Sequence, residues 1–120
     1  MKKILVVEDN HQNQYLMEYM LTKAGYLVIM AGSGCEGFAL AIKEEPDLIL
    51  MDIQLPDIDG LEVTRKIRAS ALGTRIPIVA VTSYAMTGDR GKALAVGCDG
   101  YIEKPIDPES FLKEIRKYLE

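Results

Sequence analysis

Short, unbroken runs of apolar residues recur along the chain, each about as long as a β-strand. They occupy residues 4–7, 27–31, 48–51 and 76–81, with a weaker run around Tyr101-Ile102. The runs are continuous rather than alternating, which indicates that both faces of each strand are buried. Strands of this kind are typical of a parallel sheet that is covered by helices on two sides.

The stretches between these runs have the spacing of amphipathic helices. Leu16, Met17, Met20 and Leu21 form one apolar stripe, and Gly25 follows at a position where helices commonly end. Three further stretches show similar spacing: residues 38–42 before Pro46, residues 61–67, and a weaker stretch that ends near Val96-Gly97.

The last predicted helix has the clearest start signal. Asp107 is a suitable N-cap, Pro108 fits the first helical position, and the apolar residues from Phe111 to Leu119 recur at helical spacing. Strand and helix therefore alternate five times over residues 1–120. We predict one α/β domain with a doubly wound, five-stranded parallel sheet that has helices on both faces.

Composition excludes several classes of protein. A chain of 120 residues has room for one domain, and its net charge of −4 offers no basic stripe for nucleic acid. The apolar run after Lys3 is too short for a signal peptide or a membrane span, so we expect a cytoplasmic protein that binds no membrane. Cys35 and Cys98 form no C-x-x-C pair, and with His11 as the sole histidine we expect both to be buried apolar groups rather than zinc ligands.

Polar residues follow four of the predicted strands. Because right-handed crossovers make all strands point the same way, their carboxyl ends meet at one edge of the sheet. The residues at these ends are three acids, a hydroxyl and an amine: Glu8, Asp9, Asp52, Thr82 and Lys104. In the order 2-1-3-4-5 the ligand crevice lies between strands one and three, so the three acids form its lip.

This group of side chains predicts a cation and a phosphoryl group. Two carboxylates 4 Å apart repel each other by about 4 kcal/mol at an effective dielectric constant of 20. A divalent ion that prefers oxygen ligands relieves this repulsion, so we expect Mg²⁺, with Mn²⁺ as the alternative. Lys104 and Thr82 would hold phosphoryl oxygens, and Asp52, after a fully apolar strand, would be the nucleophile.

Five segments carry recurring motif residues in a fixed order. They are Val6-Val7-Glu8-Asp9-Asn10, residues 48–56 around Asp52, Gly60, residues 77–83, and residues 97–105. With these motifs the whole chain resembles the receiver domain of two-component response regulators, in the CheY-like superfamily. The resemblance implies a flavodoxin-like (CheY-like) three-layer sandwich whose five strands lie in the order 2-1-3-4-5. It is more similar to single-domain regulators of the DivK kind, or to receivers of hybrid histidine kinases, than to the chemotaxis type.

The resemblance implies a role for each acid. Asp52 would accept a phosphoryl group from the phosphohistidine of a sensor histidine kinase or a histidine phosphotransfer protein. Asp9, Asp52 and the backbone carbonyl of Gln54 would ligate Mg²⁺, with Glu8 acting mainly through water. Lys104 would contact the phosphoryl oxygens. Such a protein is no conventional enzyme, although it catalyses its own phosphorylation and slow dephosphorylation.

The resemblance also implies a switch. Thr82 and Tyr101 would rearrange together and change the surface of the fourth helix, fifth strand and fifth helix toward a downstream protein target. The Lys104–Pro105 bond would be cis.

Because Glu120 closes the last helix, we expect no output domain, and we expect a monomer or a weak homodimer. We also hypothesise that a bulky Tyr84 slows loss of the phosphoryl group.

Several other readings compete with this one. Residues 32–37 fit G-x-G-x-x-G, but Glu36 would repel a pyrophosphate and the chain lacks the six strands of a dinucleotide fold. A haloacid-dehalogenase-like phosphatase needs an acid where Gln54 stands. A flavodoxin needs a hydroxyl and glycine loop after the first strand. A phosphorylation-independent adaptor, which keeps the site for Mg²⁺-dependent stability, is the remaining alternative.

Overall fold

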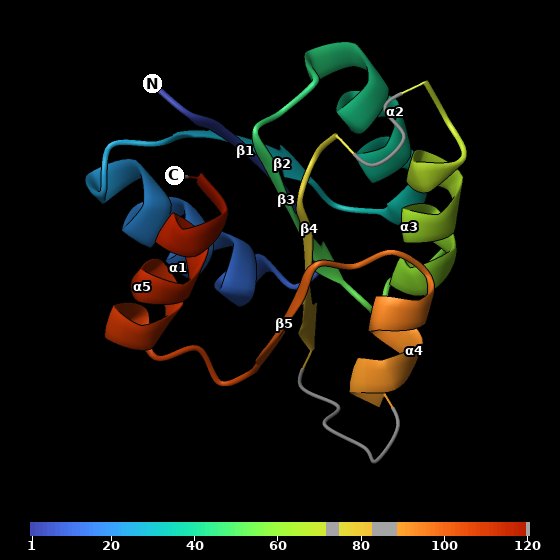
Figure 1. Cartoon of the computed structure of the whole chain (residues 1–120). Helices are drawn as coiled ribbons and strands as arrows, with labels where there is room; N and C mark the ends of the chain where they lie inside the picture. The colour runs from blue at the N-terminus through green and yellow to red at the C-terminus, as the bar shows by residue number, and fades with distance from the viewer. Residues whose placement is uncertain (72–74, 83–88, 120) are drawn as a thin grey trace.

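The computed structural model describes residues 1–71, 75–82 and 89–119. It is a three-layer α/β sandwich in which α1 and α5 cover one face of the sheet and α2, α3 and α4 cover the other (Figure 1). Its elements, in chain order, are β1 (Lys3–Val7), α1 (His11–Lys23), β2 (Leu27–Ala31), α2 (Gly34–Glu44), β3 (Leu48–Asp52), α3 (Gly60–Arg68), β4 (Ile78–Thr82), α4 (Asp89–Ala95), β5 (Gly100–Glu103) and α5 (Pro108–Leu119).

The five strands are parallel and lie in the order β2-β1-β3-β4-β5, which confirms the predicted topology. Every residue of the central strands β3 and β4 is buried. Successive side chains point to opposite faces of the sheet and so pack into two separate hydrophobic cores. Leu48 and Leu50 pack under α1 and α5, whereas Ile49 and Met51 pack under α2 and α3.

The edge strand β2 departs from the prediction that both faces of every strand are buried. Leu27 is 46% exposed, and the next three residues are half-buried. The reason is position: β2 pairs with β1 alone, so one side of it has no neighbouring strand. A run of apolar residues identifies a strand here but overstates its burial.

The start of β4 also differs from the predicted residues 76–81. The strand runs from Ile78 to Thr82 because Pro77 has no N–H to donate to a neighbouring strand. Its carbonyl still accepts a hydrogen bond from the Ile49 N–H at 3.0 Å. Asp52 and Thr82, predicted to follow their strands, are the last residues within them.

Helix α1 begins and ends at local signals in the sequence. The Asn10 side chain caps its start by accepting from the Asn13 N–H at 3.0 Å. After Lys23 the chain turns away through Gly25, whose φ of 97° is one that glycine adopts without strain. These signals place the N-terminus of α1 directly after the acids that follow β1.

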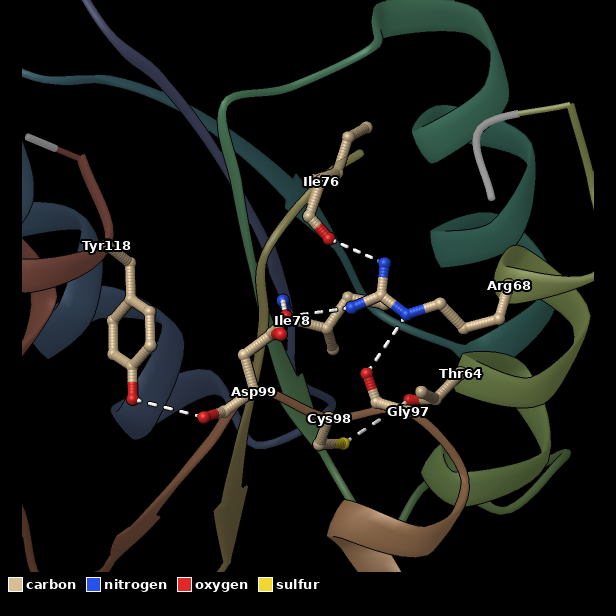
Figure 2. Close-up of polar contacts among 8 residues, drawn as sticks. All are labelled: Thr64, Arg68, Ile76, Ile78, Gly97, Cys98, Asp99 and Tyr118. Atoms are coloured by element: carbon tan, nitrogen blue, oxygen red, sulfur yellow. Dashed lines mark hydrogen bonds and ion pairs between the residues drawn. The ribbon is translucent and has the colours of Figure 1, made fainter. Parts of the chain in front are cut away.

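A network of hydrogen bonds around Arg68 holds the amino ends of β4 and β5 together, at the edge of the sheet opposite the three acids (Figure 2). The guanidinium group donates to the carbonyls of Gly97 (2.9 Å) and Ile76 (2.7 Å) and to the Asp99 carboxylate (2.8 Å). The same Asp99 oxygen accepts from the Ile78 N–H at 2.9 Å. One residue of α3 therefore fixes the beginnings of both β4 and β5.

The two cysteines are free and differ in environment. Cys98 is buried, as predicted, and burial raises the pKa of its thiol. Cys35 is exposed, which contradicts the prediction, because it lies in the first turn of α2 beside the Asp57 carboxylate. Across the described residues, no helix is both long and apolar enough to cross a bilayer.

Candidate functional site

Three acids meet at the carboxyl ends of the adjacent strands β1 and β3. Glu8 follows β1, and its N–H continues the pairing with β2 by donating to the Ala31 carbonyl at 2.9 Å. Glu8 and Asp52 are buried, with 1% and 5% exposure, whereas Asp9 is exposed. One carboxylate oxygen from each of Glu8, Asp9 and Asp52 lies within 4.8 Å of the chosen oxygens of the other two. The topology thus brings together the three acids that the sequence placed at this edge.

Lys104, which follows β5, places a positive charge between the two buried acids. Its Nζ atom lies 2.6 Å from Glu8 Oε1 and 3.5 Å from Asp52 Oδ2. Its backbone N–H donates to the Thr82 carbonyl at 2.8 Å, which fixes this residue to the end of β4. The bond to Pro105 is cis, as the sequence resemblance implied. One ammonium group therefore serves two buried carboxylates.

The environment of Asp52 makes its charged form costly. Burial, followed by the nearby Glu8 charge, raises the pKa of Asp52 to about 7, although Lys104 acts in the opposite direction. The Gln54 N–H donates to Asp52 Oδ1 at 3.1 Å and also favours the carboxylate. An additional cation would favour the ionised form of Asp52, which is the form that can act as a nucleophile.

The donor set suits a hard divalent cation. The cluster contains only carboxylates, and Mg²⁺ prefers oxygen ligands. Lys104 supplies a single positive charge against three acids, so the cluster has a net negative charge when its carboxylates are ionised. The Gln54 backbone lies beside Asp52, because its N–H donates to the Asp52 carboxylate. The residues present therefore fit a magnesium ion.

Two residues that support the site are not explained by sequence reasoning. The Gln14 side chain donates to the Glu8 carbonyl at 2.5 Å and ties α1 to the acidic turn. Gly60, known from the sequence only as a motif residue, begins α3 against the end of β3. A Cβ atom there would lie 2.1 Å from the Asp52 carbonyl oxygen, so glycine is required for this close approach.

The predicted switch residues lie on neighbouring strands. Thr82 is buried at the end of β4, one residue beyond Val81, which pairs with Asp52. Tyr101 pairs with Ala80 and packs, half-buried, against the core beneath α2 and α3. Their coupled rearrangement stays a prediction. Tyr84, which we expected to slow dephosphorylation, lies outside the described residues.

The glycine-rich stretch at residues 32–37 does not form a phosphate loop. The N–H groups of Gly34 and Cys35 already bind the Asp57 carboxylate, at 2.8 and 2.9 Å. A carboxylate of the protein thus occupies the place at the start of α2 where a phosphate would bind. His11, at the first position of α1, is exposed.

Comparisons with known proteins agree with this geometry. The family model for the response regulator receiver domain matches residues 4–116. The chain is 43% identical over 118 residues to the polar-differentiation response regulator DivK of Brucella ovis, an alignment that covers 98% of this chain and 96% of that protein.

Solved structures extend the comparison to the fold. A CheY-like receiver domain protein from Methanospirillum hungatei JF-1 superposes with a TM-score of 0.92 at 34% identity, covering 99% of this chain and 94% of the other. The receiver domain of the sensor histidine kinase PA1611 from Pseudomonas aeruginosa PAO1 gives 0.91 at 38% identity, with 98% and 97% coverage. That structure holds a magnesium ion coordinated in its active-site cleft.

Proposed function

This chain belongs to the response regulator receiver domain family, and on that premise we propose that Asp52 is its phosphoryl acceptor, in a Mg²⁺-dependent reaction. The observation that carries the proposal is the placement of Asp52. It is buried at the end of β3, within 4.8 Å of two other acids and 3.5 Å from the Lys104 ammonium group. The phosphoryl donor would be a phosphohistidine on a sensor histidine kinase or a histidine phosphotransfer protein.

In this reaction a carboxylate oxygen of Asp52 attacks the phosphorus atom of the donor. The phosphorus–nitrogen bond breaks, its electron pair stays on the imidazole, and a phosphorus–oxygen bond to Asp52 forms. Lys104, already within reach of Asp52, would hold a phosphoryl oxygen, and Thr82 would hold another at the same edge. The product is an acyl phosphate on β3.

Asp9, Asp52 and the Gln54 carbonyl would hold the magnesium ion, and Glu8 would act on it mainly through water. When bound, the ion neutralises charge on the acids and on the phosphoryl oxygens. Glu8 keeps Lys104 in place through its 2.6 Å contact, and its second oxygen accepts from the Asn10 N–H at 3.1 Å. The chain thus supplies a preset arrangement of charges for the transfer.

The phosphorylated protein would signal by changing the surface of α4, β5 and α5. A cavity of about 510 Å³ lies on this surface, and its lining includes Tyr101 and Glu103 of β5 and Lys117 of α5. Tyr101 packs against the core and also lines this cavity, so a rearrangement at the site that moves Tyr101 would change the shape of the cavity. A downstream protein target would bind or leave this face, or the phosphoryl group would pass onward.

The test is the mass of the intact protein after incubation with acetyl phosphate or a promiscuous histidine kinase, with and without MgCl₂. We expect one added phosphoryl group that requires Mg²⁺, is lost in hydroxylamine and is absent in Asp52→Asn. Asp107→Asn is the matched control, because Asp107 is an exposed aspartate at the start of α5. An unmodified wild-type protein, with a donor shown to be active on another receiver, would overturn the proposal in favour of the adaptor.

A further inference from the structure

The loop that follows Asp52, residues 53–59, is tied to a helix that takes no part in the proposed chemistry. The Asp57 carboxylate in this loop accepts hydrogen bonds from the N–H groups of Gly34 and Cys35, at 2.8 and 2.9 Å. These are the first two residues of α2. Each carboxylate oxygen takes one bond, so the side chain spans the start of the helix.

Packing reinforces this connection. A Cβ atom at Gly34 would lie 2.2 Å from Ile58 Cγ2 and 3.1 Å from the Ile58 carbonyl oxygen, so the loop rests directly on the helix start. The two ends of the loop are joined by the Gly60 N–H, which donates to the Ile53 carbonyl at 2.8 Å. Gln54 lies in the loop between Ile53 and Asp57.

We infer that Asp57 is a positioning residue for the metal site: its two bonds to α2 hold loop 53–59, and with it the Gln54 backbone, beside Asp52. This inference rests on the proposed function, because it takes the Gln54 carbonyl as a ligand. It assigns a task in metal binding to a side chain that lies outside the acidic cluster.

Elementary electrostatics supports this role. A carboxylate at a helix N-terminus is stabilised by the helix dipole and by charge-assisted hydrogen bonds. These bonds hold the pKa of Asp57 well below its usual range, so the side chain stays ionised at neutral pH. Mg²⁺ requires nearly ideal octahedral geometry, so a loop that moves away from α2 would lose affinity for the ion.

The first experiment measures Mg²⁺ affinity in Asp57→Ala. The dissociation constant is obtained from the gain in unfolding free energy as MgCl₂ is added. We expect affinity to fall about tenfold, the lower end of the range for residues that support metal ligands indirectly. Asp107→Ala is the matched control, because Asp107 also accepts two hydrogen bonds at the start of a helix, from Ser110 N (3.0 Å) and Ser110 Oγ (2.7 Å). Its Mg²⁺ affinity should equal that of the wild type.

The second experiment uses Cys35 as a reporter within the chain. Cys35 is exposed and its backbone N–H donates to the Asp57 carboxylate, whereas Cys98 is buried. Mild alkylation should therefore modify the Cys35 thiol. If Asp57 couples the loop to α2, saturating MgCl₂ should slow alkylation about fivefold in the wild type, a typical coupling between two linked sites. The ratio of the rates with and without MgCl₂ should be close to one in Asp57→Ala.

Comparing this ratio within each variant removes a direct effect of the substitution. Asp57 raises the pKa of the Cys35 thiol, so its loss speeds alkylation whether or not Mg²⁺ is present. Equal Mg²⁺ affinity in Asp57→Ala and wild type, or a wild-type ratio near one, would overturn the inference. A wild-type protein that gains no stability from MgCl₂ would instead refute the proposed function, so the two failures are distinguishable.

Discussion

Replacing Lys104 by methionine should create a protein whose stability depends on magnesium. The Lys104 side chain is 11% exposed, and its ammonium group lies 2.6 Å from a Glu8 carboxylate that is itself 1% exposed. Methionine has a similar length but no charge. Removing one partner of a buried ion pair commonly costs about 3–5 kcal/mol, because the other charge is left buried without compensation.

The structure places the expected loss at the lower end of this range, about 3 kcal/mol. Glu8 keeps its bond from the Asn10 N–H, and Asp52 keeps its bond from the Gln54 N–H, so neither acid loses every partner. Magnesium would replace part of the missing charge. Saturating MgCl₂ should therefore stabilise Lys104→Met by more than it stabilises the wild type.

The assay is urea unfolding followed by far-ultraviolet circular dichroism, with and without MgCl₂, since the chain has no tryptophan. Lys117→Met is the control. Its ammonium group lies 3.2 Å from Glu114, but the lysine side chain is 64% exposed, and such surface pairs contribute at most about 1 kcal/mol. A loss below about 1 kcal/mol in Lys104→Met, or a gain from MgCl₂ no larger than that of the wild type, would refute the reasoning.

Three further predictions test other parts of the molecule. Gly60→Ala should lower the unfolding free energy by more than about 2 kcal/mol in urea titrations and weaken phosphorylation, because the added Cβ atom meets the Asp52 carbonyl oxygen at 2.1 Å; a stable, fully phosphorylated variant would contradict this. Arg68→Met should cost about 2–3 kcal/mol in the same titrations yet leave phosphorylation of Asp52 intact, because its hydrogen bonds lie at the opposite edge of the sheet. Hydrogen bonds from Ser110 lower the pKa of Asp107 below the ordinary 3.8, so the carboxylate adds stability above about pH 4 that is lost as the pH falls through its folded-state pKa. Asp107→Asn should therefore be less stable than the wild type near neutral pH, and the difference should shrink in acid; a constant difference across this range would count against the capping role.

Most of the architecture follows from the apolar pattern. The runs that became β3 and β4 are buried on both faces, as their continuity predicted, and parallel pairing then places Asp52 and Thr82 at one edge. The same pattern overstated the burial of Leu27, because an apolar run identifies a strand but does not show that the strand has a neighbour on one side only, as β2 does at the edge of the sheet. The environment of Cys35 was also mispredicted, since it depends on a neighbour 22 positions away.

The supporting contacts of the site were beyond sequence reasoning for a related reason. The bond from Gln14 to the Glu8 carbonyl depends on how α1 leaves β1, and the bonds of Asp57 depend on how loop 53–59 meets α2. Both are products of loop geometry, which has no periodic signature. The sequence identified Gly60 as a motif residue. Only the fold shows why a glycine is needed there: the Asp52 carbonyl lies too close for a Cβ atom.

The contact between Glu8 and Lys104 joins residues 96 positions apart, nearly the full length of the chain. During synthesis from the N-terminus, the acids on β1 and β3 emerge from the ribosome long before the lysine that neutralises them. A nascent chain that ends before β5 would carry Asp52 without the ammonium group that lies 3.5 Å from it in the folded protein. On the proposed function, an unfinished copy that lacks Lys104 would therefore be a poor phosphoryl acceptor.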